Sequence, residues 1–385
     1  MIMSEDMTLL FLAELTKPVS PHGGGGVNKI VYYLVEELIK KKYEVVLFAS
    51  GDSETSAKLV PVVPVHLDQI EGLESKVKDL LKVKSVSSLF NYLNKNISNK
   101  IVIHNHLVWR YHVFSENIHY PTITTLHNNP LSDYANDVYS KLSNNNYLIS
   151  ISKNQSRIVS NSGVKIYKNI YHGIPLNLFN FSPDNKNTNN TLFYIGRISE
   201  GKGLGEIIDI AKRYNKTLII AGDKDDKEVD YFNYIMNKIK ENKNLRYYGE
   251  LHLNKKNEII SKSKLFLFPI KWEEPFGLVT IESMACGTPV VAYARGSIPE
   301  VVKDGETGFI VNSSEKDIRG NWIIKKTGIE GLCEAVERIY SMPAEQYQEM
   351  RRKCREHVDR NFSVEKMVNE YKIVYEKMLA TNSKS

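Results

Sequence analysis

The stretch that decides the fold runs from Phe266 to Gly287 and reads Phe-Leu-Phe-Pro-Ile-Lys-Trp-Glu-Glu-Pro-Phe-Gly-Leu-Val-Thr-Ile-Glu-Ser-Met-Ala-Cys-Gly. Its start belongs to a short apolar run, 264–268, that ends at Pro269 and is typical of a buried strand of a parallel sheet. A helical pattern follows Gly277 and ends at Gly287, the usual residue just past a helix end. The sequence therefore predicts a helix whose N-terminus lies beside the carboxyl end of a strand.

Two carboxylates flank this helix N-terminus. Glu274 lies just before the helix and Glu282 lies near its second turn. The first backbone N–H groups of a helix lack internal partners and its dipole favours anions, so this end suits a phosphate. Carboxylates would not bind that phosphate, but they accept hydrogen bonds from sugar and ribose hydroxyls. A surface helix with two solvated glutamates is the simplest alternative.

The block from Glu274 to Val291 resembles the E-x7-E signature of family 4 retaining glycosyltransferases, also called glycosyl transferases group 1. The resemblance implies the GT-B fold, an α/β architecture of two Rossmann-like, doubly wound parallel-sheet domains that face a central cleft. It implies that Glu274 contacts the donor sugar and acts in catalysis, and that Glu282 contacts the nucleotide ribose. The donor site would also include Phe276, Gly277 and Leu278. The whole block is far more specific than two glutamates at this spacing, which weighs against the surface helix.

Length and composition are those of a two-domain globular enzyme. The chain has 385 residues, which is more than one hydrophobic core usually serves, and 42% of them are hydrophobic and 25% charged. The net charge of +6 is too small, without an accompanying motif, to predict nucleic-acid binding. This excess could instead help to hold a polyphosphate donor or an anionic membrane surface.

Cysteine usage and hydropathy predict a cytoplasmic protein. Cys286, Cys333 and Cys354 are too few and too scattered for a disulfide framework or a zinc site. The apolar run 9–13 is too short for a signal peptide or a spanning helix, and no other stretch is apolar enough to cross a bilayer. Peripheral contact with the inner face of the membrane stays open.

A glycine-rich loop follows the first predicted strand, 8–15. Four glycines, 23–26, precede a helix predicted over 27–42 from its apolar stripe. Such glycines let backbone amides approach a phosphate, although a flexible turn explains the loop about as often. The loop also resembles the N-terminal Gly-Gly pattern of the family, which implies that Gly25 and Gly26 bind the donor.

Histidines follow two predicted strands of the N-terminal half. One strand ends in His104-Asn105-His106, and another, 122–126, is followed by His127. Open α/β folds bind ligands at this end of the sheet, and the family keeps a histidine after a similar strand to contact the donor sugar. His127 is therefore a candidate catalytic residue, whereas His104 is equally consistent with a buried histidine satisfied by its neighbours. His172 stands where the family more often has asparagine, so no role is carried onto it.

A basic loop opens the C-terminal half, between a strand over 192–195 and a helix over 204–214. It resembles the family's Gly-Arg-x4-Lys-Gly motif, which implies that Arg197 and Lys202 bind the donor diphosphate and act in catalysis. Arginine can make two parallel hydrogen bonds to a phosphate, and lysine acts as a point charge. Both are expected to lie in an exposed loop, and a solvated basic loop is the alternative. Related enzymes hold the nucleotide base at the backbone positions of Gly249, Glu250 and Leu251.

The domain boundary is predicted at Gly173. An acceptor-side domain would span 1–172, a nucleotide-sugar domain 173–363, and a closing helix, 364–380, would pack back onto the first domain as in GT-B proteins. The polar stretch 185–190 supports a linker near that boundary. The sequence assigns no function to a polar insertion at 317–327.

These features predict a retaining glycosyltransferase that moves a sugar from a UDP- or GDP-linked donor to a hydroxyl of a sugar, lipid-linked or small-molecule acceptor. No metal or other cofactor is expected, because cationic side chains and helix N-termini take the place of an ion. A GT-B nucleotide-sugar epimerase would share the fold and the donor site. A non-catalytic two-domain sugar-binding protein is a further alternative, but such proteins are usually exported.

Overall fold

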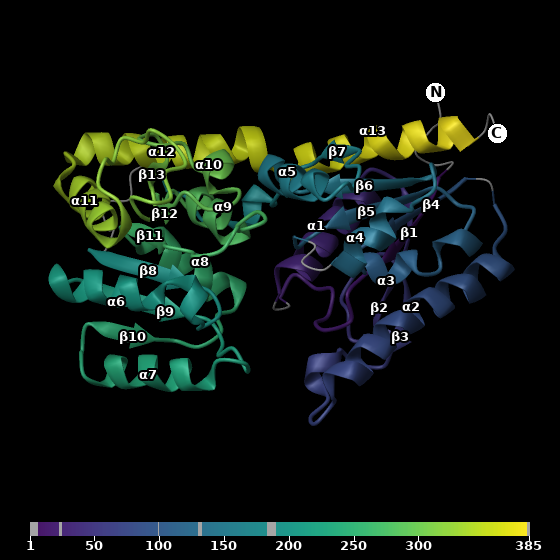
Figure 1. Ribbon diagram of the computed structural model, residues 1–385, viewed down its shortest axis with the longest axis horizontal. Helices are drawn as coiled ribbons and strands as arrows, with labels where there is room; N and C mark the ends of the chain where they lie inside the picture. The colour runs from purple at the N-terminus through teal and green to yellow at the C-terminus, as the bar shows by residue number, and fades with distance from the viewer. Residues whose placement is uncertain (1–6, 23–24, 99, 130–132, 183–189, 383–385) are drawn as a thin grey trace. The chain divides into compact units, whose positions relative to one another are not determined.

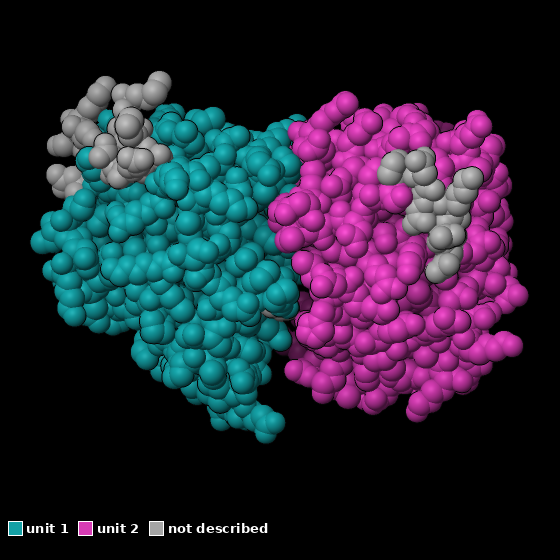
Figure 2. Space-filling view, turned by 180° about the vertical axis from the view of Figure 1, so that it is seen from behind, with its two compact units in different colours: residues 1–174, 363–385 teal, residues 175–362 magenta. Residues whose placement is uncertain are grey.

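The computed structural model describes residues 7–22, 25–98, 100–129, 133–182 and 190–382. The chain divides into two compact units (Figures 1 and 2), unit 1 with residues 1–174 and 363–385 and unit 2 with residues 175–362. Two of the glycines singled out above, Gly23 and Gly24, and positions 185–189 of the predicted linker lie outside the described residues.

Unit 1 is built around a parallel sheet in the order β3-β2-β1-β4-β5-β6-β7. Its strands are β1 (Thr8–Leu12), β2 (Glu44–Ser50), β3 (Lys58–Val63), β4 (Ile101–Asn105), β5 (Thr122–Leu126), β6 (Asn146–Ser150) and β7 (Lys168–Asn169). Its helices are α1 (Gly26–Lys40), α2 (Ser75–Lys95), α3 (Trp109–His112), α4 (Asp133–Ser140), α5 (Lys153–Asn161) and α13 (Val364–Asn382). The strand order reverses between β1 and β4, which is where sheets of this kind bind ligands.

Helix α13 packs against the sheet of unit 1 through buried polar contacts. The Tyr375 hydroxyl lies 2.7 Å from His104 Nδ1, and the Tyr371 hydroxyl lies 2.8 Å from Thr125 Oγ1. That threonine hydroxyl also lies 2.8 Å from His104 Nε2, so both ring nitrogens of this fully buried histidine have partners. His104 is therefore a satisfied core residue, the alternative that its sequence position left open.

Unit 2 contains a second parallel sheet in the order β10-β9-β8-β11-β12-β13. Its strands are β8 (Thr191–Ile195), β9 (Thr217–Ala221), β10 (Leu245–Tyr247), β11 (Leu265–Phe268), β12 (Val290–Tyr293) and β13 (Gly308–Val311). Its helices are α6 (Leu204–Arg213), α7 (Val229–Lys240), α8 (Leu253–Lys262), α9 (Leu278–Ala285), α10 (Ile298–Val301), α11 (Gly328–Ser341) and α12 (Ala344–Phe362). The predicted α/β class with two doubly wound parallel sheets is confirmed, and the reversal of strand order in this unit lies between β8 and β11.

Candidate functional site

The reversal point of unit 2 brings the basic loop and Glu274 together. Lys202 follows β8 and Glu274 follows β11, and these strands are neighbours in the sheet. The Lys202 Nζ atom lies 3.4 Å from Glu274 Oε2 and 4.3 Å from the centre of the Trp272 ring. Loops at adjacent strand ends meet here because parallel strands all end at the same edge of the sheet.

Lys202 is less accessible than its loop position predicts. Its side chain is only 16% exposed, so the expectation of an exposed residue is wrong for Lys202. Burial disfavours the ammonium and lowers the pKa of Lys202, although the charge and hydrogen bond of Glu274 oppose this shift. A partly desolvated cation interacts with an anionic ligand more strongly than a solvated one does.

Arg197 lies on the same loop and does fit the expectation. Its side chain is 67% exposed, and one guanidinium nitrogen lies 3.2 Å from Asp225 Oδ2. The Tyr194 hydroxyl donates to the Arg197 carbonyl at 2.9 Å, which fixes the backbone while the side chain projects into solvent. An arginine whose side chain is this exposed can exchange its carboxylate partner for a phosphate at little cost.

Glu274 is held at the N-terminus of α9. Gly277 precedes this helix with a φ of 78°, a conformation that glycine adopts without strain. The Gly277 N–H donates to Glu274 Oε1 at 3.2 Å, while the other carboxylate oxygen faces Lys202. Leu278 opens the helix, and Phe276 is buried beneath the loop at 2% exposure. The structure thus gathers Lys202, Glu274 and the start of α9, as the motif predicts.

Glu282 lies farther along α9 in a different environment. Its Oε2 atom lies 2.8 Å from Lys256 Nζ of α8, and the two side chains are 1% and 5% exposed. Sequence reasoning did not identify Lys256, because a lysine on a helix is usually solvated and its spacing to Glu282 carries no signal. The ribose contact of Glu282 stays a prediction.

The predicted base-binding backbone lies on the loop between β10 and α8. The Gly249 carbonyl accepts from the Gly222 N–H at 2.7 Å, which ties this loop to the turn after β9. Glu250 is exposed and Leu251 is partly buried. Among the hydrogen bonds of the described residues, this loop is joined to that turn rather than to Glu274, so its role also stays a prediction.

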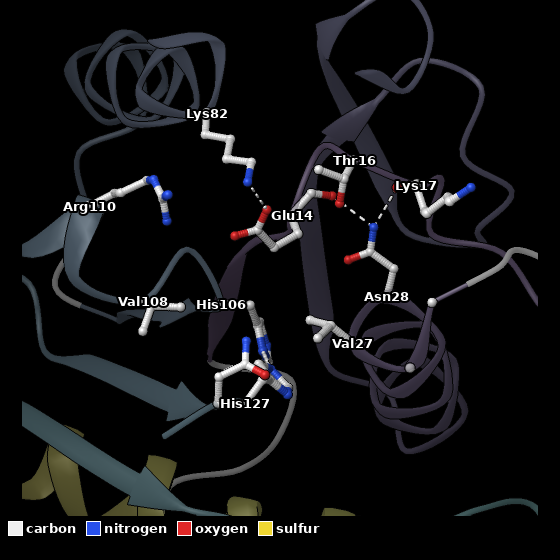
Figure 3. Close-up of a pocket in the computed structure, with 13 residues that line it drawn as sticks. Glu14, Thr16, Lys17, Val27, Asn28, Lys82, His106, Val108, Arg110 and His127 are labelled. Atoms are coloured by element: carbon white, nitrogen blue, oxygen red, sulfur yellow. Dashed lines mark hydrogen bonds and ion pairs between the residues drawn. The ribbon is translucent and has the colours of Figure 1, made fainter. Parts of the chain in front are cut away.

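Unit 1 has a cavity of about 380 Å³ at its own reversal point (Figure 3). Three residues singled out from the sequence line it: Gly25 and Gly26 at the start of α1, and His127 after β5. The cavity is also lined by cationic and acidic side chains, among them Lys82 and Glu14, which form an ion pair at 3.1 Å. Groups 100 residues apart therefore converge on one concave site, a usual form for a small-molecule site.

A second histidine adjoins His127. The His106 Nδ1 and His127 Nε2 atoms lie 2.7 Å apart, and the side chains stand next to each other in Figure 3. Burial lowers the pKa of His127 to about 3, and burial with three neighbouring imidazoles lowers the pKa of His106 well below its usual value of 6.5. Both rings are therefore neutral at neutral pH, and one must donate to the other. The sequence pattern His104-Asn105-His106 could have identified His106, but it gives no sign of which histidine faces the cavity.

Metal-binding and membrane-spanning features can be assessed only in the described part of the chain. Over those residues, no group of three or more His, Cys, Asp or Glu side chains is arranged to hold a metal ion. No helix within the same ranges combines the length and the apolar composition that crossing a membrane requires.

The comparison with protein families matches a part of unit 2. Residues 178–357 match the family described as glycosyl transferases group 1. An alpha-maltose-1-phosphate synthase of Mycobacterium tuberculosis is 33% identical over 158 residues, which are 39% of this chain and 38% of that protein. An uncharacterised 41.2 kDa protein of Klebsiella pneumoniae is 30% identical over 187 residues, 48% of this chain and 45% of the relative. The chain thus matches less than half the length of these curated relatives.

Solved structures match both units. A sucrose-phosphate synthase from Thermosynechococcus elongatus has a TM-score of 0.78 at 20% identity, over 97% of this chain and 99% of that one. The Anabaena protein HepE, solved with UDP-glucose, has a TM-score of 0.73 at 17% identity, over 97% of this chain and 100% of that one. These likenesses confirm the expected GT-B fold. The part of the chain that matches the glycosyl transferases group 1 family, residues 178–357, lies within unit 2.

Proposed function

We propose that this chain is a retaining glycosyltransferase that takes its sugar from a nucleotide diphosphate and transfers it to a hydroxyl. Unit 2 would bind the donor, with UDP the first nucleotide to test because HepE was solved with UDP-glucose. Unit 1 would bind the acceptor in the cavity beside His106 and His127. The proposal includes a reaction in the cytoplasm, with any contact with the membrane depending on the acceptor.

The observation that carries this proposal is the contact between Lys202 and Glu274 at the start of α9. A cation, a carboxylate and a helix N-terminus at one point suit a ligand that joins a diphosphate to a hydroxyl-rich sugar. The proposal assigns the diphosphate to Arg197, Lys202 and the helix, and the sugar hydroxyls to Glu274. The nucleotide ribose is assigned to Glu282.

In the proposed reaction, the bond between the anomeric carbon and the diphosphate oxygen breaks while the acceptor oxygen attacks from the same face. The departing diphosphate takes the proton of the acceptor hydroxyl. Arg197 and Lys202 would stabilise the charge that develops on the diphosphate, an effect usually worth about 3 to 4 kcal/mol per well-placed donor. His127 would hydrogen-bond the donor sugar as a neutral imidazole.

The test is a product analysis with UDP- and GDP-linked sugars and a panel of hydroxyl acceptors. Transfer with retained anomeric configuration, lost in Lys202→Met, supports the proposal. A control without acceptor distinguishes transfer from epimerisation, because an epimerase forms its product from the donor alone. If no nucleotide sugar binds or reacts, the proposed function is wrong.

A further inference from the structure

The polar insertion of unit 2 has a defined internal structure although it contains no helix or strand. It lies between β13 and α11, and Asn312 organises its fold. The Asn312 Oδ1 atom accepts from the Arg319 N–H at 2.9 Å and from the Trp322 ring N–H at 3.1 Å, and its amide donates to the Gly320 carbonyl at 3.0 Å. One buried amide thus turns the insertion back and presents the Arg319 side chain.

The Arg319 side chain forms an ion pair with Glu273. Its two terminal nitrogens lie 2.8 Å from Glu273 Oε2 and 2.7 Å from Glu273 Oε1, which is a two-pronged arginine–carboxylate pair. The third nitrogen, Nε, donates to Asp317 Oδ1 at 2.8 Å and so keeps the guanidinium in this orientation. Arg295 reaches the other oxygen of Asp317 at 2.9 Å and Glu273 at 3.5 Å. The network joins the insertion to the loop after β11 at several points.

Glu273, the partner of Arg319, directly precedes Glu274 in the chain. The same loop is fixed from a second side, where the Gly296 N–H donates to Glu273 Oε2 and the Ser297 N–H donates to the Glu274 carbonyl, both at 2.9 Å. A Cβ atom at Gly296, which has a φ of 58°, would lie 2.2 Å from that carbonyl oxygen, so the backbones can approach only because this residue is glycine. The Ser297 N–H therefore holds the Glu274 backbone from one direction, and Arg319 holds the neighbouring Glu273 side chain from the other.

The network also neutralises a charge. Partial burial opposes ionisation of Glu273, but the hydrogen bonds and charge of Arg319, with smaller contributions from Gly296 and Arg295, lower the pKa of Glu273. Glu273 is therefore a carboxylate with two arginine partners. Without Arg319, Glu273 would lose the two-pronged partner that fixes its carboxylate beside Glu274.

We propose that Arg319 is a positioning residue for the donor sugar. By holding Glu273 it fixes the carboxylate of Glu274 against Lys202, in the place where that carboxylate accepts hydrogen bonds from a sugar hydroxyl. The insertion would thus contribute to recognition of the sugar rather than of the nucleotide. This inference rests on the proposed function, since it assumes a nucleotide-sugar donor at Glu274.

The test compares binding and turnover in the full-length protein. Arg319→Ala should reduce kcat/KM for sugar transfer between about tenfold and a hundredfold, because small displacements of a positioned group are costly. Its affinity for UDP alone should stay within about twofold of wild type, since an effect exerted through Glu274 concerns the sugar. Arg319→Lys keeps the positive charge but cannot make two parallel hydrogen bonds to Glu273, so it should recover part of the kcat/KM that Arg319→Ala loses. Arg338→Ala, which removes an exposed arginine paired with Glu334 on α11, is the matched control and should change neither value.

A double variant shows whether Arg319 acts through Glu273. Once Glu273→Gln has weakened the pair between Arg319 and residue 273, adding Arg319→Ala should lower kcat/KM little further, because the two changes remove the same interaction. The inference is wrong if Arg319→Ala transfers sugar like wild type, or if it loses UDP binding and thermal stability in parallel, as a purely structural residue would. A wild-type protein that binds no nucleotide sugar would contradict the proposed function and this inference together, whereas an active Arg319→Ala contradicts the inference alone.

Discussion

The Lys256 ammonium lies 2.8 Å from the Glu282 carboxylate, and the two side chains are almost completely buried, at 5% and 1% exposed. The glutamate that the motif assigns to ribose is therefore also half of an interior ion pair between α8 and α9. Removing one partner of such a pair leaves an uncompensated charge in the protein, which is far more costly than losing an exposed pair.

Glu282→Ala is accordingly expected to destabilise unit 2 by about 3 to 5 kcal/mol. Glu282→Gln keeps the shape and a hydrogen-bond acceptor, so it should cost less and is the better variant for binding studies. Urea unfolding followed by tryptophan fluorescence gives both values. The control is Glu258→Ala, which breaks exposed pairs with Lys255 and Lys262 on α8 and should leave the midpoint nearly unchanged. Equal effects of Glu282→Ala and Glu258→Ala would show that burial of the Lys256 pair has no energetic consequence.

Glu274 and Glu282 should differ in what they recognise. Glu274→Ala should spare the affinity for free UDP and reduce transfer from a UDP-sugar by about one to two orders of magnitude, the usual range for a lost hydrogen bond to a charged acceptor. Glu282→Gln should weaken UDP and UDP-sugar alike, because both carry the ribose. Calorimetry and initial rates on each variant decide the matter. The division of roles is wrong if Glu274→Ala loses UDP binding as severely as Glu282→Gln does.

Unit 1 should lose stability in mild acid. Burial lowers the pKa of His112 and His127 from 6.5 to about 3, and lowers that of His104, His106 and His172 well below 6.5. Near pH 6.5 these histidines bind protons in the unfolded chain but not in the folded unit. The stability that they contribute is therefore complete above that pH, and it falls as the pH drops from 6.5 towards 3. Each histidine contributes up to about 1.4 kcal/mol per pH unit within that window. Limited proteolysis at pH 7.5 and 5.5 should show cleavage moving into unit 1 at the lower pH, and an unchanged pattern would argue against buried neutral histidines.

Sugar transfer should not require a divalent metal. Asp223 and Asp225 have the Asp-x-Asp spacing found in metal-dependent transferases, but Asp225 pairs with Arg197 at 3.2 Å. The cations Arg197 and Lys202 would neutralise the diphosphate in place of an ion. Activity after treatment with EDTA should therefore equal that of the untreated enzyme. A loss of activity that Mg²⁺ or Mn²⁺ restores would assign the charge stabilisation to a metal.

The sequence predicts the parts of the fold that depend on local pattern. The strand and helix around Glu274 were predicted because an apolar run, a proline and two glycines mark their ends, and the structure has β11 and α9 there. Strand β3 was not predicted, because Pro61 lies within it and proline is tolerated only at a sheet edge, the position of β3 in the strand order. Edge position is a property of the whole sheet and cannot be read from a short segment.

The parts of the site that the sequence did not predict depend on tertiary contacts. Lys202 is mostly covered, and its Nζ atom lies over the ring of Trp272, seventy residues later. The Lys256–Glu282 pair joins two helices, and the Arg319–Glu273 fork joins an irregular insertion to the loop after β11. Family motifs locate residues that touch the ligand, but they carry no information about side chains that orient those residues.

The most direct test of the account is calorimetric titration of UDP into the wild-type protein and into an Arg197→Ala/Lys202→Met double variant. The account predicts saturable binding to the wild type and a loss of affinity of at least about a hundredfold in the variant, since two charge-assisted contacts to the diphosphate are removed. Thermal melting of the variant without ligand checks that it is folded. A folded variant that binds UDP as tightly as the wild type would contradict the assignment of the diphosphate to this loop.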